Sequence, residues 1–269
     1  MAGMRVVITG GARGIGYGLA RAFLERGASV VISGRRPETI EKAVRDLAAE
    51  SDSGRIGGER CDVTSLAQVQ GLWDYAVERM GGVDIWINNA GIGQGVSDLD
   101  AMDGEFIASI VDTNCRGALF GCKVALSGMK RQGQGAIYNV EGLGSKGPII
   151  RGMTVYAATK RALSYITDSV ALETRGTGVL VGALLPGMTV TDLITAQYEG
   201  KPQEWARVRG IFNILSDRVE TVCPWLVERM LANRKNGVRF NWLGTSRTLG
   251  RFLSAPFVKR SVYPASLDG

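Results

Sequence analysis

The sequence predicts one α/β domain in which a doubly wound parallel sheet is covered by helices on both faces. Short apolar segments typical of buried strands alternate with helix-periodic segments along the chain, and repeated β-α units of this kind build parallel sheets. A glycine-rich turn joins the first strand segment to the first helix segment, and no linker rich in Pro, Gly or Ser divides residues 1–269. One domain is therefore the simplest organisation.

The predicted strands and helices follow one another in regular order. MRVVIT, residues 4–9, is an apolar run that ends at glycines and predicts a buried strand. Residues 15–26 have helical periodicity and stop at Gly27, whereas residues 37–50 open with a proline, which suits the first turn of a helix. Further strands are expected at 28–33, up to 61–63, and at 83–91, 135–140, 178–185 and 238–243, and further helices at 65–80, 106–130, 156–174 and 218–232.

Composition excludes several kinds of chemistry. The chain has 269 residues, of which 45% are hydrophobic and 22% charged, as in ordinary globular proteins. It has no histidine, which removes Ser-His-Asp triads and nearly every zinc site, so we predict no metal centre. The four cysteines form no CxxC pair and are expected to be free thiols. Because no apolar run is long enough to span a membrane and the first strand begins close to Met1, we expect a cytoplasmic protein without a signal peptide.

The net charge of +6 is concentrated near the C-terminus. Residues 218–269 carry 9 basic and 3 acidic side chains, which accounts for the whole excess. No nucleic-acid motif accompanies them, so we expect no nucleic-acid partner. Two interpretations of the basic C-terminal extension, residues 244–269, stay open. Its apolar residues pack on the fold or on a partner subunit while the cations face water, or the extension makes a peripheral contact with an anionic membrane.

The turn TGGARGIG, residues 9–16, has the composition of a nucleotide-binding site. Glycines allow a tight turn and a close approach of the backbone to a pyrophosphate, while the N-terminus of the next helix offers unpaired N–H groups. Between a strand and a helix, this pattern is typical of the Rossmann-type dinucleotide fold. The cofactor-binding residues predicted in the turn are Gly10, Arg13, Gly14, Ile15 and Gly16.

The end of the second strand favours NADP(H) over NAD(H) as the cofactor. NAD-binding proteins usually place an acid there, which binds the ribose 2′-hydroxyl. This chain reads Ser33-Gly34-Arg35-Arg36 instead, and Arg13 can face the same position. Because guanidinium groups bind phosphate oxygens well, we predict that Arg13, Arg35 and Arg36 bind a 2′-phosphate.

Further motifs extend this pattern over most of the chain. They are Asn88-Asn89-Ala90-Gly91 at the end of the fourth strand, Asn114 on the following helix, Tyr156 and Lys160 four residues apart, and Pro186-Gly187 after the sixth strand. Together with the glycine turn, these motifs have the order and spacing found in the short-chain dehydrogenase/reductase family. The sequence resembles that family over roughly residues 4–192.

The resemblance implies roles for these residues. Tyr156 would give or take a proton at the substrate oxygen, and the charge of Lys160 would lower the pKa of the phenol from its usual value of about 10. Lys160 would also hold the nicotinamide ribose, and Asn114 would anchor a proton-relay water. The other implied cofactor contacts are Asp62 and Val63 at the adenine, Asn89, Ala90 and Gly91 at the ribose, and Pro186, Gly187, Thr189 and Thr191 at the carboxamide.

The serine that polarises the substrate carbonyl in this family is missing from its usual place. The family strand ends Ile-x-Asn-x-Ser-Ser, and alignment on Ile137 and Asn139 places Glu141-Gly142 on the two serines. Ser145 is the next hydroxyl, and it either returns to the substrate through its glycine-rich loop or is a surface residue. Glu141 is a poorer substitute, because an ionised carboxylate repels an oxyanion.

Several segments also resemble the chlorophyll b reductase branch of the family. They are NVEGLGS, YAATKRAL, LLPGMTVTDL and the C-terminal run from FNILSDRVETV to TSRTLGRFL. That branch also has an acid-glycine pair followed by a later serine. The resemblance therefore implies that the changed loop is a feature of a branch rather than the decay of a site.

The resemblance leads to one functional expectation and several alternatives. We expect an NADPH-dependent carbonyl reductase that acts on an aldehyde or ketone of a fairly large apolar substrate, such as the formyl group of chlorophyll b. A steroid, quinone or imine reductase and a catalytically silent NADP-binding regulator are the alternatives. Residues 189–215 would form a substrate lid with Trp205, Ile211 and Phe212 as apolar contacts, and helices 106–130 and 156–174 would form a homodimer or homotetramer interface.

Overall fold

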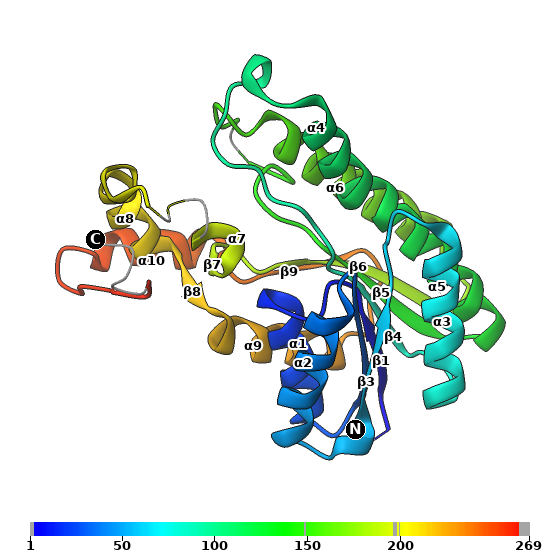
Figure 1. The fold of residues 1–269 in the computed structure, drawn as a ribbon. Helices are drawn as coiled ribbons and strands as arrows, with labels where there is room; N and C mark the ends of the chain where they lie inside the picture. Colours follow the sequence, from blue (N-terminus) through cyan, green and yellow to red (C-terminus); the bar gives the residue numbers. More distant parts are fainter. Residues whose placement is uncertain (1–2, 148, 196–197, 199, 264–269) are drawn as a thin grey trace.

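The computed structural model describes residues 3–147, 149–195, 198 and 200–263. Its centre is a seven-stranded sheet in the order β3-β2-β1-β4-β5-β6-β9, in which every neighbouring pair is parallel (Figure 1). The predicted doubly wound parallel sheet is thus confirmed. The strands are β3 (Ile56–Arg60), β2 (Ser29–Gly34), β1 (Arg5–Ile8), β4 (Ile85–Asn88), β5 (Gly135–Val140), β6 (Val179–Leu185) and β9 (Val238–Asn241).

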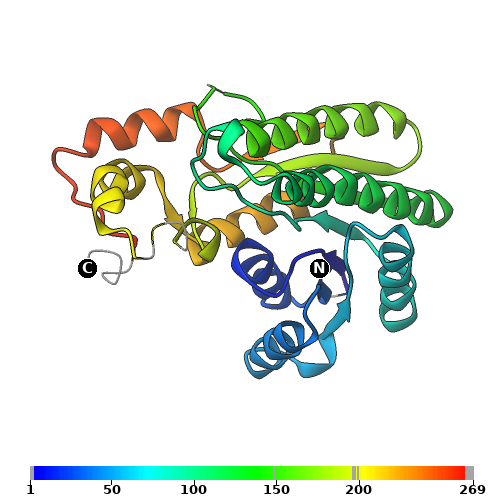
Figure 2. The ribbon, with the colours of Figure 1, turned by 45° about the horizontal axis from the view of Figure 1, so that its top comes forward.

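Helices cover both faces of the sheet, as Figure 2 shows. The helices of one face are α1 (Gly14–Leu24), α2 (Pro37–Ala49) and α9 (Val219–Ala232), and those of the other are α3 (Leu66–Met80), α5 (Gly117–Gln132) and α6 (Thr154–Glu173). Each layer encloses its own apolar core, with Phe23 and Leu226 in the first and Trp73 and Trp86 in the second. The strand order reverses between β1 and β4, and in such sheets ligands bind beside the carboxyl ends of the strands at this point.

The predicted long helix 106–130 is wrong in one respect, because it is divided into three parts. They are α4 (Gly104–Val111), a π-helical segment η3 (Asp112–Arg116) and α5. A π-helical turn holds an extra residue, and such turns are frequent at functional sites. The predicted strand ends were also too late, since β3 stops at Arg60 and β4 at Asn88, so Asp62, Val63 and Asn89 lie in the loops that follow.

The predicted lid region has more regular structure than the sequence indicated. It contains β7 (Thr189–Val190), α7 (Asp192–Thr195) and α8 (Pro202–Leu215), while residues 196–197 and 199 lie outside the described part. β7 pairs with β8 (Asp217–Arg218), just before α9. In the C-terminal extension, α10 (Thr245–Ser254) lies beside α8 and away from the main sheet (Figures 1 and 2). Residues 264–269 of that extension are not described.

Within the described residues, no helix combines the length and the apolar character needed to cross a bilayer. The four cysteines are free thiols, as predicted.

Candidate active site

The glycine turn is bound directly to the end of β4. The side-chain amide of Asn89 donates to the carbonyl oxygens of Thr9 and Gly10, each at 2.9 Å, and the Thr9 hydroxyl accepts from the backbone N–H of Asn89 and Ala90. An ideal Cβ on Gly10, whose φ is +64°, would lie 2.9 Å from the Cα of Ala90. Only glycine therefore allows the two loops to approach this closely.

The N-terminus of α1 is suited to an anion. Its capping residue, Arg13, is extended and makes no side-chain cap, so the N–H groups of the first turn keep the donor capacity that a phosphate would use. Gly14 and Ile15 begin this helix, and Gly16 is buried against Asn89. The described residues thus fit the pyrophosphate of a dinucleotide.

The basic residues expected at the adenosine end lie beside this turn. Arg13, Arg35 and Arg36 are exposed, and the charge of Arg35 acts on the carboxylate of Asp62. Burial opposes ionisation of Asp62, but hydrogen bonds from Thr64 and the charge of Arg35 lower its pKa.

Two further predicted contacts lie close to the same corner. The backbone N–H of Gly11 donates to Ser33 O at 3.0 Å, which joins the end of β2 to the glycine turn. Val63 is buried. A methyl carbon of its side chain would lie only 2.6 Å from an ideal Cβ on Gly117, at the start of α5. Val63 is therefore packed against α5 more than it is open to a ligand.

The loop after β6 closes on the glycine turn from the other side. Gly187 has a φ of +72°, and the hydroxyl of Thr189 donates to Pro186 O at 3.3 Å within a tight turn. The side chain of Thr191 lies against Gly14, since a Cβ on that glycine would stand 3.4 Å from the threonine methyl group. The predicted nicotinamide loop and the pyrophosphate turn are thus neighbours.

Tyr156 and Lys160 lie one turn apart near the start of α6. The ammonium of Lys160 is 5.5 Å from the centre of the Tyr156 ring and donates to Val140 O at 2.9 Å. Lys160 is buried, and its nitrogen would lie 3.9 Å from a Cβ on Gly91. The pair therefore stands where the ends of β4 and β5 meet.

The pKa of Tyr156 differs from the expectation. Burial raises the pKa of Tyr156 to about 12, so the charge of Lys160 does not offset the loss of solvation. Burial also lowers the pKa of Lys160 to about 8. Both groups are protonated at neutral pH, and Tyr156 is prepared to give a proton rather than to take one.

The π-helical turn η3 directs Asn114 into the same region. The side chain of Asn114 is buried, accepts from Ile92 N at 2.8 Å, and donates to Ile92 O and to the hydroxyl of Thr159. Thr159 in turn donates to Tyr156 O at 2.7 Å. Asn114 thus connects the loop after β4 with the helix that carries Tyr156.

The loop after β5 places Gly142 and Ser145 beside Tyr156. An ideal Cβ on Gly142 would lie 2.9 Å from the Tyr156 hydroxyl oxygen, so this position matches the missing serine. Ser145 is 1% exposed, and its hydroxyl accepts from the backbone N–H of Gly142 at 3.1 Å. The interpretation of Ser145 as a surface residue is wrong, because Gly144, at a φ of +95°, packs the loop against Ala157 of α6.

Gln94 is a site residue that the sequence did not reveal. It is 1% exposed, accepts from Tyr156 N at 2.9 Å and donates to Gly152 O at 2.9 Å. Tyr156 is in the first turn of α6, where backbone N–H groups lack helical partners. Gln94 therefore caps α6 from a distant loop, and no local sequence pattern indicates such a cap.

Glu141, the other residue in place of a family serine, points away from a substrate role. Its side chain is fully buried, and its backbone N–H donates to Leu184 O at 2.9 Å, which continues the pairing of β5 with β6. The nearest cation is Arg239 of β9, with 3.7 Å between its terminal nitrogen and a carboxylate oxygen of Glu141. Burial raises the pKa of Glu141, and Arg239 opposes that effect.

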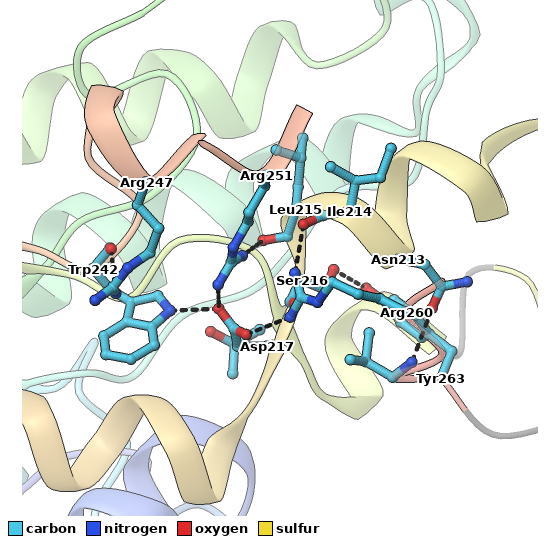
Figure 3. Close-up of polar contacts among 12 residues, drawn as sticks. Asn213, Ile214, Leu215, Ser216, Asp217, Trp242, Arg247, Arg251, Arg260 and Tyr263 are labelled. Atoms are coloured by element: carbon cyan, nitrogen blue, oxygen red, sulfur yellow. Dashed lines mark hydrogen bonds and ion pairs between the residues drawn. The ribbon is translucent and has the colours of Figure 1, made fainter. Parts of the chain in front are cut away.

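The described part of the C-terminal extension is bound to the buried carboxylate of Asp217 (Figure 3). Asp217 accepts from Trp242, Arg251 and Arg260, the last at 2.7 Å. Tyr263 shares a hydrogen bond of 2.7 Å with the side chain of Ser216. These arginines are therefore engaged within the fold.

Trp205 does not face a substrate as predicted. It is 1% exposed and packs at 4.9 Å, ring centre to ring centre, against Tyr263. Phe212 belongs to the same cluster, whereas Ile211 is exposed. Helix α8 and residues 262–263 thus share one small core.

A phenol that is protonated at neutral pH and a glycine turn that fits a pyrophosphate together suit hydride exchange at an alcohol or carbonyl carbon. The fold and this arrangement are those of the nicotinamide-dependent oxidoreductases that act on CH–OH and C=O groups. The family model for short chain dehydrogenases matches residues 4–202. The chain belongs to this family.

Similar proteins agree with this assignment. A probable chloroplastic chlorophyll(ide) b reductase of Oryza sativa subsp. japonica is 34% identical over 98% of this chain and 56% of its own length. A second chlorophyll(ide) b reductase of that species is 35% identical over 84% of this chain and 66% of its own. The chain thus spans between about half and two thirds of these relatives. An actinorhodin polyketide ketoreductase crystallised with NADPH has a TM-score of 0.80, with 26% identity over 91% of this chain and 98% of its own.

Proposed function

We propose that this protein is an NADPH-dependent reductase of a large apolar aldehyde or ketone, with the formyl group of chlorophyll b or a related pigment as the first candidate. The observation that carries this proposal is the protonated Tyr156 beside Gly142 and the buried hydroxyl of Ser145. When bound, NADPH supplies a hydride to the carbonyl carbon. Tyr156 donates its proton to the carbonyl oxygen, and the product is an alcohol.

Ser145 is the residue that would polarise the carbonyl. Its oxygen accepts from Gly142 N, which leaves the hydroxyl proton free for another acceptor. A donor aimed at the developing oxyanion is worth about two orders of magnitude in rate. Lys160 and Asn114 would hold the cofactor ribose and the proton path behind Tyr156.

The preference for the phosphorylated cofactor rests on Arg13, Arg35 and Arg36. They are exposed at the end of β2 and in the glycine turn, and none of the salt bridges between described residues involves them. Guanidinium groups in such a position suit a 2′-phosphate, and no acid stands at position 34 to favour a free 2′-hydroxyl.

The apolar substrate is supported by the rim of the site. Exposed apolar side chains lie on two loops that contact each other through the hydrogen bond from Ser97 N to Gly152 O, at 3.0 Å. They are Val96, Leu143, Ile149 and Ile150, with Ile149 99% exposed. The chlorophyll(ide) b reductases similar to this chain give the pigment its place as first candidate.

The test is turnover of NADPH with chlorophyll b, chlorophyllide b and a panel of simple aldehydes and ketones, analysed by chromatography of the products. We expect conversion of the formyl to the hydroxymethyl pigment and its loss in Tyr156→Phe. Conversion of simple aldehydes alone would refute the pigment assignment and leave the reductase. No NADPH consumption with any carbonyl compound would favour a silent NADP-binding regulator.

The outer faces of α5 and α6 are proposed as a homodimer or homotetramer interface. Leu119, Tyr165 and Leu172 are exposed there by 48%, 76% and 57%. Light scattering after size exclusion measures the mass of the particle, and Tyr165→Asp with Leu172→Asp should reduce it to that of one chain. A single-chain mass in the unchanged protein would refute the interface.

The apolar side of α10 is proposed as the peripheral membrane contact. Leu249, Phe252 and Leu253 are exposed there, although the arginines of the extension are bound to the fold. Co-sedimentation with anionic vesicles should be lost in Phe252→Glu with Leu253→Glu. No binding by the unchanged protein would leave packing as the role of the extension.

A further inference from the structure

The carboxylate of Glu141 is a buried charge that the proposed chemistry does not use. Neither of its oxygens has a hydrogen-bond partner among the described residues, and the same holds for Nε of Arg239. An ionised carboxylate without hydrogen bonds in the protein interior is costly. Such a group calls for a role that a neutral side chain would not fill.

The sheet directs this carboxylate toward α6. Side chains alternate along a strand, and the side chain of Asn139, two residues earlier, donates to the hydroxyl of Thr167 on α6 at 3.0 Å. Arg239 reaches the same helix, where it donates to Ser164 and forms an ion pair of 2.7 Å with Asp168. Glu141 is therefore enclosed between Arg239 and one face of α6. The same face carries Lys160, one helical turn before Ser164.

Glu141 and Lys160 interact through their charges. The carboxylate of Glu141 favours the charged form of Lys160, against the effect of burial, which disfavours it. Lys160 donates to the carbonyl of Val140, so the residue just before Glu141 already fixes the ammonium at this place. The strand end thus offers Lys160 both a hydrogen bond and a nearby negative charge.

The other titratable groups near this pair do not supply that charge. Cys115 of η3 also acts on Lys160, but burial raises the pKa of its thiol, so the thiol is neutral at pH 7. Tyr156 is neutral as well. Around Glu141, the charged groups are Arg239 of β9, Asp168 of α6 and Lys146 of the loop after β5.

We propose that Glu141, enclosed between Arg239 and the face of α6 that carries Lys160, is a positioning residue whose negative charge keeps the Lys160 ammonium protonated beside Tyr156. This inference rests on the proposed function in so far as it gives Lys160 a role in the reaction. A terminal nitrogen of Arg239 lies 3.7 Å from the carboxylate, and Arg239 is itself anchored by Asp168, which is half-exposed. The acid that replaces the first family serine thus serves the lysine and not the substrate.

The test measures the protonation of Lys160 directly. The protein without cofactor, labelled with ¹³C at the lysine ε-carbon, is titrated by NMR, and Lys160→Met identifies the resonance. Glu141→Gln should lower the titration midpoint of Lys160 by about one pH unit, since a nearby opposite charge has an effect of this size. An unchanged midpoint in Glu141→Gln would overturn the proposal.

Two further variants separate this role from a structural one. Asp168→Asn removes the other partner of Arg239 and should leave the midpoint of Lys160 close to that of the unchanged protein. Glu141→Ser restores the residue usual in the family and removes the charge, so it should lower the midpoint as Glu141→Gln does and decides the question if Glu141→Gln does not fold. A midpoint in Glu141→Ser equal to that of the unchanged protein would then contradict the proposal.

Activity gives an independent comparison. The alkaline limb of the pH profile for NADPH oxidation with a simple aldehyde should move to lower pH in Glu141→Gln, because a neutral Lys160 no longer supports Tyr156. A shifted NMR midpoint with no reductase activity in the unchanged protein would uphold the charge pairing and refute the proposed function. A loss of activity at every pH with an unshifted midpoint would show a structural role only.

Discussion

Gly142 lies against the hydroxyl of Tyr156, with only 2.9 Å between that oxygen and the position of an ideal Cβ on the glycine. Most members of the family have a serine at this position. Here the residue is a glycine, and its backbone N–H donates to the hydroxyl of Ser145. The nearest hydroxyl of this loop, that of Ser145, is thus three residues further along the chain and contacts the backbone of Gly142.

Ser145→Ala should lower kcat by about a hundredfold, because one donor to the oxyanion is lost. NADPH binding, followed by thermal shift, should be unchanged, since Ser145 contacts Gly142 and no predicted cofactor residue. The measurement is steady-state NADPH oxidation with a saturating aldehyde. A kcat within a few-fold of the unchanged protein would place carbonyl polarisation on Tyr156 alone.

Arg35→Ala should weaken NADPH far more than NADH. A charge-assisted contact is worth about 1.5–3 kcal/mol, so the Kd for NADPH should rise by roughly ten- to a hundredfold. Arg45→Ala, on the exposed part of α2, is the matched control and should change neither Kd. Equal affinity of the unchanged protein for both cofactors would contradict the predicted preference for NADPH.

Lys160→Met should raise the stability of the protein at pH 7. The pKa of Lys160 is lowered from 10.5 to about 8 in the folded state, so the unfolded chain binds its proton more tightly. The cost of burying the ammonium is fully present below pH 8 and fades as the pH rises to 10.5. After allowance for the lost hydrogen bond to Val140, we expect a gain of about 1–2 kcal/mol at pH 7.

Urea denaturation at pH 7 and pH 10 measures this gain. It should be smaller at pH 10, and Lys42→Met, at an exposed position, should show no comparable increase at pH 7. A loss of stability in Lys160→Met at both pH values would mean that packing and hydrogen bonding outweigh the cost of the charge.

Asp217→Asn should destabilise the C-terminal extension. Removal of one charge from a buried ion-pair group costs about 3–5 kcal/mol, and here two arginines lose their partner. Limited proteolysis should cut after residue 244 much faster than in Glu41→Gln, which changes an exposed pair. Burial opposes ionisation of Asp217, but the hydrogen bonds from Trp242 and the two arginines lower its pKa overall, so its stabilisation is present above about pH 4 and is lost as the pH falls through the lowered pKa.

The parts of this protein that could be predicted from the sequence are those that short patterns determine. The parallel sheet, the glycine turn and the Tyr156–Lys160 spacing follow from periodicity and from motifs within a few residues. The burial of Ser145 could not be decided, because it depends on the contact of Gly144 with Ala157 in another element.

Other features depend on contacts between distant residues. Gln94 caps a helix that begins 60 residues later, and its partner is a backbone group that no side-chain pattern marks. Asp217 binds arginines more than 30 positions away, so a basic C-terminus that looked free in the sequence is engaged in the fold. The pKa of Tyr156 was predicted in the wrong direction, since burial cannot be judged from spacing.

The absence of a side chain at Gly142 affects which carbonyl compounds can reach the hydroxyl of Tyr156. A formyl group attached to a rigid, flat macrocycle stays next to that ring. The adjacent substituents of the ring therefore enter the site together with the formyl group. A side chain at position 142 would meet those neighbours before the oxygen came within reach of Tyr156. If Ser145 supplies the hydroxyl, as proposed, steric hindrance beside Tyr156 is reduced, and the site would admit crowded carbonyl groups and still keep a donor.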